Sequence, residues 1–165
     1  MTLYKYLNIL FLFVSFNINS QTNWVTYSAN KINIAFDLPG EDIYYSSDDG
    51  EGFLSETFYN ADEDFELLIT QFRGKETYSD NLNFDEELSG IASEYDYKNF
   101  SLFFENEIKP GVNSKYAITY DTDYECMVIF GVIHDKISKT IYDIELVCFE
   151  ISVFDGAIII ESFKI

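Results

Sequence analysis

The chain contains only two cysteines, Cys126 and Cys148, and their placement raises the question of a disulfide. The apolar segments 124–134 and 140–151 are each expected to form a strand, and an antiparallel pairing can place Cys126 opposite Cys148. Such a pair could form a disulfide in an oxidising compartment. The alternative is two small apolar core residues. Neither cysteine has a basic neighbour to lower its pKa, so thiol catalysis is not expected.

The same pairing predicts how side chains divide between the two faces of the sheet. Phe130, Ile144 and Leu146 would share one apolar face with the cysteines. Asp143 and Glu145 would lie on the other face, in water. The register therefore predicts a sheet with one apolar face and one acidic face.

His134 is the only histidine, which restricts the sites that the chain can build. It stands beside Asp135 at the end of a predicted strand, so we expect an exposed turn residue. No cluster of Cys, His and acidic residues has the spacing of a zinc site. No Gly-x-Ser-x-Gly motif marks a hydrolase nucleophile, and no Gly-rich loop is suited to phosphate. We expect no catalytic residues and no cofactor.

Two acidic series alternate along the chain and are weak candidates for a cation site. Asp62, Asp64 and Glu66 form the first, and Asp121, Asp123 and Glu125 form the second. Alternation places the members of a series on one face of a strand, where they could offer oxygen ligands to calcium. The alternative is a set of solvated charges that protect a sheet edge.

Residues 1–20 have the pattern of a signal peptide. Lys5 precedes the apolar run 7–16, and small polar residues follow it up to Ser20. The run is about ten residues long, whereas a membrane helix needs roughly 20. We expect cleavage after Ser20, no lipid anchor, no stable membrane insertion afterwards, and a periplasmic or extracellular protein. An uncleaved anchor and a buried first strand are the alternatives.

The composition indicates a single acidic domain, residues 21–165. The chain of 165 residues carries a formal net charge of −19, which repels nucleic acid and anionic lipid and favours a soluble monomer. Aromatic residues make up 18% of the chain, mostly Phe and Tyr, and suit half-buried strands. The segment 41–52 is acidic and is expected to be an exposed loop. We expect strands at 23–29, 32–38, 53–59, 65–72, 99–108, 115–120, 124–134 and 140–151.

Two segments have helical features. Phe84, Leu88, Ile91 and Tyr95 recur with the spacing of one helix face, behind a possible N-cap at Asn83. In the tail, Ser152-x-x-Asp155 is a capping-box pattern before an apolar run, and it favours a helix over 153–163. Asp155-Gly156 is also typical of a two-residue hairpin turn, which leaves a strand pair as the alternative. The elements together predict an α+β fold, an antiparallel sheet of about seven to eight strands flanked by two helices.

The order of elements and three short motifs resemble the Mog1/PsbP-like superfamily. The motifs are Trp24-x-x-Tyr27, then Ile34-x-Phe36 ahead of Pro39, and the closing residues 162–164 (Ser-Phe-Lys). The chain is most similar to its small exported bacterial members, of the Bacteroidetes type. The resemblance implies an α/β sandwich and an accessory role, since known members include a photosystem subunit, a small-GTPase-binding factor and chaperones for secreted effectors.

We therefore expect an exported, non-enzymatic binding or accessory protein of the cell envelope. Its partner would be a protein or another envelope component whose identity the sequence does not reveal. Two alternatives stay open: a hydrolase that uses carboxylates in a cleft beside 41–52, and a calcium-dependent envelope protein.

Overall fold

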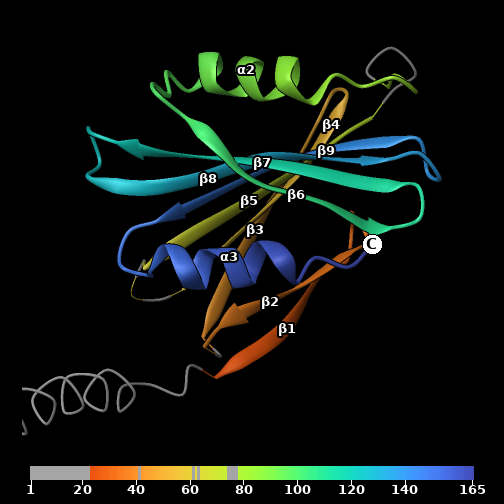
Figure 1. Cartoon of the computed structure of the whole chain (residues 1–165). Helices are drawn as coiled ribbons and strands as arrows, with labels where there is room; N and C mark the ends of the chain where they lie inside the picture. The colour runs from red at the N-terminus through yellow and green to blue at the C-terminus, as the bar shows by residue number, and fades with distance from the viewer. Residues whose placement is uncertain (1–22, 41, 61, 63, 74–77) are drawn as a thin grey trace, which may run out of the picture.

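The computed structural model describes residues 23–40, 42–60, 62, 64–73 and 78–165 (Figure 1). The expected signal peptide, residues 1–20, lies outside this range, so export stays a prediction. Within the described part of the chain, no helix has both the length and the apolar character that crossing a membrane requires.

Seven described strands form one antiparallel sheet in the order β3-β4-β5-β9-β8-β7-β6. The C-terminal strand β9 lies between β5 and β8 and joins the two halves of the sheet. The strands are β3 (Ile43–Gly50), β4 (Phe53–Asn60), β5 (Phe65–Phe72), β6 (Ser101–Lys109), β7 (Val112–Asp121), β8 (Cys126–Asp135) and β9 (Thr140–Cys148).

A separate two-stranded sheet, β1 (Trp24–Ala29) and β2 (Ile34–Pro39), packs beside the C-terminal residues. Ala35 and Lys164 exchange two backbone hydrogen bonds of 2.8 Å. The Phe36 ring meets the Phe163 ring edge-on at 5.6 Å between centroids. The second motif, Ile34-x-Phe36, and the closing motif, residues 162–164, are therefore neighbours in space.

Helix α2 (Phe84–Glu94) confirms the helix predicted from apolar spacing. The Asn83 side chain accepts a hydrogen bond from the Asp85 backbone N–H, which is the expected N-cap. Helix α3 (Val153–Glu161) confirms the helical interpretation of the tail. Its cap is Ser152, whose Oγ accepts from the Asp155 N–H and donates to the Asp155 carboxylate.

The two helices cover opposite faces of the sheet (Figure 1). On one face, α3 and the β1–β2 sheet enclose the larger core cluster, which includes Ile129, Ile144 and Leu146. On the other face, α2 encloses a smaller cluster, in which Leu88 and Ile91 pack with Phe130. This arrangement confirms the predicted α+β fold with two flanking helices.

The predicted loop over 41–52 is wrong. Residues 43–50 form β3, an edge strand that pairs with β4 along its whole length. Six of its eight positions are exposed, and only the end residues Ile43 and Gly50 are partly buried. Its acidic, exposed side chains resemble those of a loop because an edge strand has few residues to bury.

The predicted β8–β9 register is also wrong, by one residue. Met127, and not Cys126, lies opposite Cys148. Strand β8 is apolar at almost every position because both of its faces are covered, so its sequence shows no alternation that would define the register. Phe130, Ile144 and Leu146 are all buried, as expected, but Phe130 lies on the opposite face from the other two.

The register correction separates the two cysteines. Cys126 belongs to the cluster beneath α2, whereas Cys148 belongs to the cluster beneath α3. Both are buried, free thiols. The disulfide considered for this pair is absent from the structure.

Candidate functional site

A cavity of about 300 Å³ lies between the C-terminal end of α2 and the sheet. Its walls combine apolar side chains with carboxylates, and we call it the acidic groove. It is lined by Phe53, Ser55, Leu68, Thr70, Phe72, Ile91, Glu94, Tyr95, Asp143, Ile144 and Glu145.

Strand register brings the polar side chains of the acidic groove together. Ser55 of β4 lies opposite Thr70 of β5, and Thr70 lies opposite Asp143 of β9. Facing residues of antiparallel strands project from the same face, so the three side chains form a polar row across the sheet. The Ser55 and Thr70 hydroxyls are 3.0 Å apart and hydrogen-bonded. Asp143 stands at the end of this row.

Glu145 lies two positions along β9 and projects from the same face. The Tyr97 hydroxyl donates a 2.5 Å hydrogen bond to Glu145 Oε1. Glu145 Oε2 is buried and has no hydrogen-bond partner among the described residues. One carboxylate oxygen is therefore held in place while the other is left unsatisfied.

The end of α2 closes the acidic groove. The helix stops at Glu94, and Tyr95 is its C-cap residue. The Tyr95 ring stacks on the Tyr97 ring with centroids 5.6 Å apart. This stack places two tyrosines and Glu94 over the Asp143 and Glu145 side chains of β9.

Two carboxyl groups of the acidic groove, those of Asp143 and Glu145, have raised pKa values. Burial, together with the charges of Glu87 and Glu94, raises the pKa of Asp143 to about 7. Burial also raises the pKa of Glu145, an effect that the Tyr97 hydrogen bond opposes. Burial, together with the Glu145 charge, raises the pKa of Tyr95 to about 12. A proton therefore occupies Asp143 for part of the time at neutral pH.

Among the described residues, no Lys, Arg or His lines the acidic groove. Three carboxylates thus share a partly buried space in which the described lining offers no basic counter-ion. Isolated buried charges of one sign are unfavourable, and an added cation would relieve their repulsion. The arrangement is suited to a ligand with a positive head and an apolar stem.

From the sequence we expected the Asp143 and Glu145 side chains to lie in water, so the acidic groove was not predicted. The one available signal is the composition of β9, where two carboxylates alternate in an otherwise apolar strand. Such alternation indicates one polar face but does not show that a helix covers it.

Two of the candidate cation ligands, Asp64 and Asp121, form hydrogen bonds within turns. The Asn60 amide donates to Asp64 Oδ2 at 2.7 Å, and the Asp64 N–H donates back to Asn60 Oδ1 at 2.8 Å. Asp121 Oδ1 accepts from the N–H groups of Asp123 at 2.8 Å and Tyr124 at 3.2 Å. Both arrangements stabilise turns. Asp62 lies in the same β4–β5 turn as Asp64. Across the described residues, no group of three potential ligands is placed to hold a metal ion.

The prediction that His134 is exposed is wrong. Its side chain is 1% exposed and lies against the Tyr78 and Phe84 rings, with centroid distances of 5.2 and 6.3 Å. Burial lowers its pKa. The side chain is therefore part of the packing beneath the start of α2.

Comparison with known proteins extends the fold assignment but adds no site residue. The Saccharomyces cerevisiae Ran-binding protein Mog1p matches with a TM-score of 0.53 and 8% identity, over 87% of this chain and 96% of that chain. A mutant of the protein Mog1 matches with a TM-score of 0.54 and 8% identity, over 86% of this chain and 95% of that chain. No protein-family model matches the chain, and no curated protein matches it.

These matches confirm the Mog1-like fold that the sequence motifs indicated. At 8% identity the likeness extends to the fold alone, because unrelated functions can share a fold. The bacterial, exported character inferred from the sequence stays a prediction.

Proposed function

We propose that the chain is an exported accessory protein of the cell envelope that binds a basic segment of a protein partner in the acidic groove. The observation that carries the proposal is the presence of Glu94, Asp143 and Glu145 in one cavity whose described lining residues include no basic side chain. A guanidinium or ammonium group would supply the missing positive charge.

The walls of the acidic groove fit the rest of such a side chain. Phe53, Phe72 and Tyr95 offer aromatic surface, and Ile91 adds an aliphatic wall from α2. The methylene stem of Arg or Lys packs well on apolar surface while its charged head meets carboxylates. Aromatic faces also attract cations directly.

The charge of the whole chain supports a basic partner. A formal net charge of −19 attracts positively charged surfaces over long range and speeds their encounter. Mog1p, which shares the fold, is described as a Ran-binding protein, so protein binding has a precedent in this architecture. The partner of this chain would be recognised by its basic side chains.

A matched pair of peptides tests the binding chemistry. One carries a single arginine between glycines, and the other carries citrulline, a neutral isostere, at the same position. Calorimetry should detect the arginine peptide and give at least about tenfold weaker binding for citrulline, a difference of about 1.4 kcal/mol. Equal binding of both peptides would contradict the proposal.

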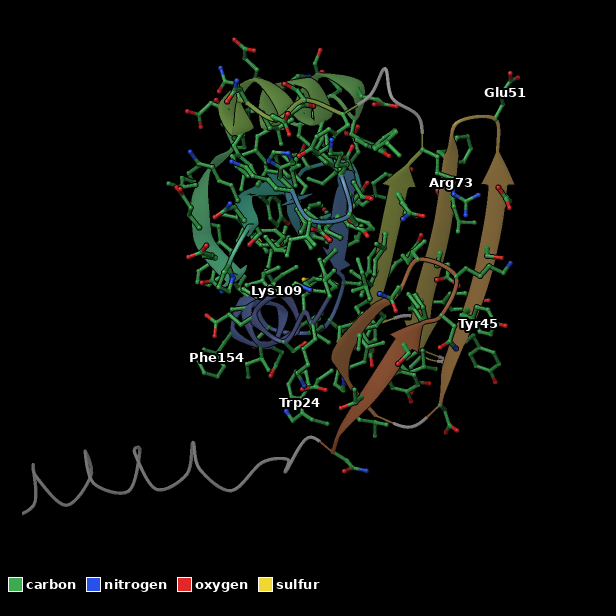
Figure 2. The ribbon with its side chains drawn as sticks, turned by 90° about the vertical axis from the view of Figure 1, so that its right-hand side faces the viewer. Trp24, Tyr45, Glu51, Arg73, Lys109 and Phe154 are labelled. Carbon is green, nitrogen blue, oxygen red and sulfur yellow. The ribbon has the colours of Figure 1, made fainter. Side chains whose placement is uncertain are left out.

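Variants then test the location. Asp143→Asn combined with Glu145→Gln removes two charges from the acidic groove. Asp48→Asn combined with Glu51→Gln removes two exposed charges from the β3–β4 hairpin, where Figure 2 shows Glu51 at the tip. Affinity capture from the native envelope fraction should lose a partner with the first variant and keep it with the second. Equal recovery with both would place the interaction elsewhere.

Export rests on the signal-peptide pattern of residues 1–20 and has its own test. The protein purified from its native host should have the mass of a chain that begins at Gln21. A mass that includes residues 1–20 would refute cleavage and leave an uncleaved anchor or a buried first strand as the explanation.

A carboxylate-based hydrolase is the rival function, and one observation favours it. Asp143, with its pKa raised to about 7, has the acidity that a general acid requires near neutral pH. A panel of glycoside and ester substrates separates the two functions. Turnover that Asp143→Asn abolishes would establish the hydrolase.

A further inference from the structure

A second cavity lies on the opposite face of the β3–β4 hairpin from the acidic groove. It has a volume of about 470 Å³ and lies between this hairpin and the β1–β2 sheet. Ser55 and Glu56 are neighbours in β4 and project to opposite faces, so Ser55 lines the acidic groove and Glu56 lines this second cavity. The two sites therefore share a strand and no lining residue.

Glu56 is a buried carboxylate that forms no ion pair among the described residues. The residue is 3% exposed, and its Oε2 has no hydrogen-bond partner among the described residues. Burial raises its pKa, while the charge of Lys31 and the backbone N–H groups of Ile32 and Lys31 oppose that effect. A buried carboxylate with one oxygen that lacks a hydrogen bond is unfavourable unless another group donates to that oxygen or neutralises the charge.

The basic side chain in the lining, Lys31, is hydrogen-bonded to Ser47, the residue opposite Glu56 on β3. Its Nζ donates a 2.6 Å hydrogen bond to the Ser47 hydroxyl at the exposed side. Among the described residues, Lys31 and Glu56 do not form an ion pair. The cavity thus contains a carboxylate that is influenced by the charge of Lys31 but does not form an ion pair with it.

Aromatic side chains surround the same space. Tyr45 of β3 faces Phe58 of β4 across the strand pair, and their rings stack with centroids 6.2 Å apart at 24°. Tyr27 of β1 adds a third ring to the lining. Tyr45 is 68% exposed, and Figure 2 shows it on the outer edge strand. A large aromatic side chain on an edge strand is then available to close over a ligand.

We propose that this cavity binds an alkylammonium group, with Glu56 as the counter-charge and Tyr27, Tyr45 and Phe58 as the aromatic walls. Aromatic boxes with a nearby carboxylate attract ammonium groups through the ring quadrupoles and through charge pairing. The walls favour the methyl or methylene carbons next to the nitrogen, which a bare metal ion lacks. The ammonium can belong to a small free cation or to a lysine side chain.

Two pairs of probes test the proposal and separate these sources. Tetramethylammonium is compared with tert-butanol, a neutral molecule of similar shape. Nα-acetyl-lysine methylamide is compared with the corresponding norleucine derivative, which lacks the charge. Binding is followed by shifts of backbone amide NMR signals, and we expect them at Tyr45, Glu56 and Phe58 with the charged member of a pair only.

The set of probes that bind identifies which kind of molecule supplies the ammonium group. Binding of both cations assigns the site to alkylammonium groups in general, whereas binding of one assigns it to a small quaternary cation or to a lysine side chain. If neither cation binds, or if each neutral analogue binds as tightly as its cation, the proposal is overturned.

Variants locate the site. Glu56→Gln should weaken cation binding at least about tenfold, and Tyr45→Ala should weaken it about fivefold. The matched control is Tyr44→Ala, since Tyr44 is 54% exposed, stacks on Tyr59 and projects from the opposite face of β3. The control should bind within about twofold of the wild type. Tyr45→Ala is at an exposed position and keeps the test valid even if Glu56→Gln fails to fold. Unchanged binding in Tyr45→Ala would overturn the proposal.

Discussion

Cys126 and Cys148 lie on opposite faces of the β8–β9 strand pair. Cys126 is buried under α2, and Cys148 is buried under α3, where its Sγ lies 3.2 Å from the position that a Cβ on Gly156 would take. A bond between the two sulfurs would have to pass through the sheet. The folded chain therefore has no route to an intramolecular disulfide.

We predict that both cysteines remain thiols even after export to an oxidising compartment. Burial raises the pKa of Cys126 and raises the pKa of Cys148 to about 12, so both are also poor nucleophiles. Alkylation in denaturant without a reductant, followed by mass spectrometry, should label both. A mass that changes only after reduction would show the disulfide and contradict the register.

Gly131 is predicted to be intolerant of any side chain. A Cβ at this position would lie 2.1 Å from Tyr116 Cδ1 and 2.6 Å from the Lys115 carbonyl oxygen. Tyr116 lies opposite Gly131 across β7–β8 and is fully buried, so it has little room to move. Gly131→Ala should destabilise the protein by about 3 kcal/mol, measured by urea unfolding.

Gly90→Ala is the matched control for Gly131→Ala. Gly90 lies in the interior of α2, it is exposed, and nothing lies within 4 Å of an added Cβ. Alanine at this position should stabilise the protein by about 0.5–1 kcal/mol. Destabilisation of both variants to a similar extent would contradict the packing described for β7 and β8.

Asp143 is predicted to make stability depend on pH. Its pKa is raised from 3.8 to about 7 in the folded state, so the folded chain holds this proton more tightly than the unfolded chain. Its contribution is fully present below about pH 4 and is lost as the pH rises to about 7. Asp143→Asn, which cannot ionise, should gain stability relative to the wild type over this range, by up to about 4 kcal/mol at pH 8.

The control for Asp143→Asn is the same substitution at an exposed aspartate, Asp48. Asp48→Asn removes one charge from the edge strand β3 and should follow the wild-type curve within about 0.5 kcal/mol at each pH. Urea unfolding of the three proteins between pH 4 and 8 provides the curves. Parallel curves for Asp143→Asn and the wild type would show that Asp143 ionises normally.

Ser162 is predicted to anchor β2 to the end of the chain. Its hydroxyl accepts a 2.7 Å hydrogen bond from the Asp37 backbone N–H and donates one of 2.7 Å to the Ile159 carbonyl. Ser162→Ala leaves the Asp37 N–H without this partner and should destabilise the protein by about 1–2 kcal/mol.

Ser89→Ala is the control for Ser162→Ala. The Ser89 hydroxyl is exposed and donates a hydrogen bond to the Asp85 carbonyl within the same helix, α2. Because alanine has the higher helix propensity, this change should be neutral or slightly stabilising in thermal unfolding. If Ser162→Ala is equally harmless, the C-terminal contact with β2 contributes little to the fold.

Much of the fold could be predicted from local signals. The spacing of Phe84, Leu88 and Ile91 defines α2 because one face of a helix must be apolar. The β4–β5 hairpin and helix α3 also agree with their turn and capping residues. These features depend on residues close together in the sequence, where the chemistry of a few side chains decides the structure.

The register of β8 could not be predicted in the same way. A strand that is buried on both faces is apolar throughout, so a shift by one residue keeps it apolar and leaves no pattern to reject. The β8–β9 turn sets the register instead, since Asp135 Oδ1 accepts from the N–H groups of Ile137 and Ser138. The acidic groove depends on this register and on the position of α2, both of which are long-range properties.

The central claim is that the acidic groove binds a positively charged side chain. If it does, the bound cation lowers the pKa of Asp143 and expels its proton, which is present for part of the time near pH 7. Calorimetry of the arginine peptide at pH 7 in two buffers of different ionisation enthalpy measures this release. We predict a release of up to about half a proton per bound peptide in the wild type and a much smaller release in Asp143→Asn. Binding without proton release, or the same release from both proteins, would contradict the claim.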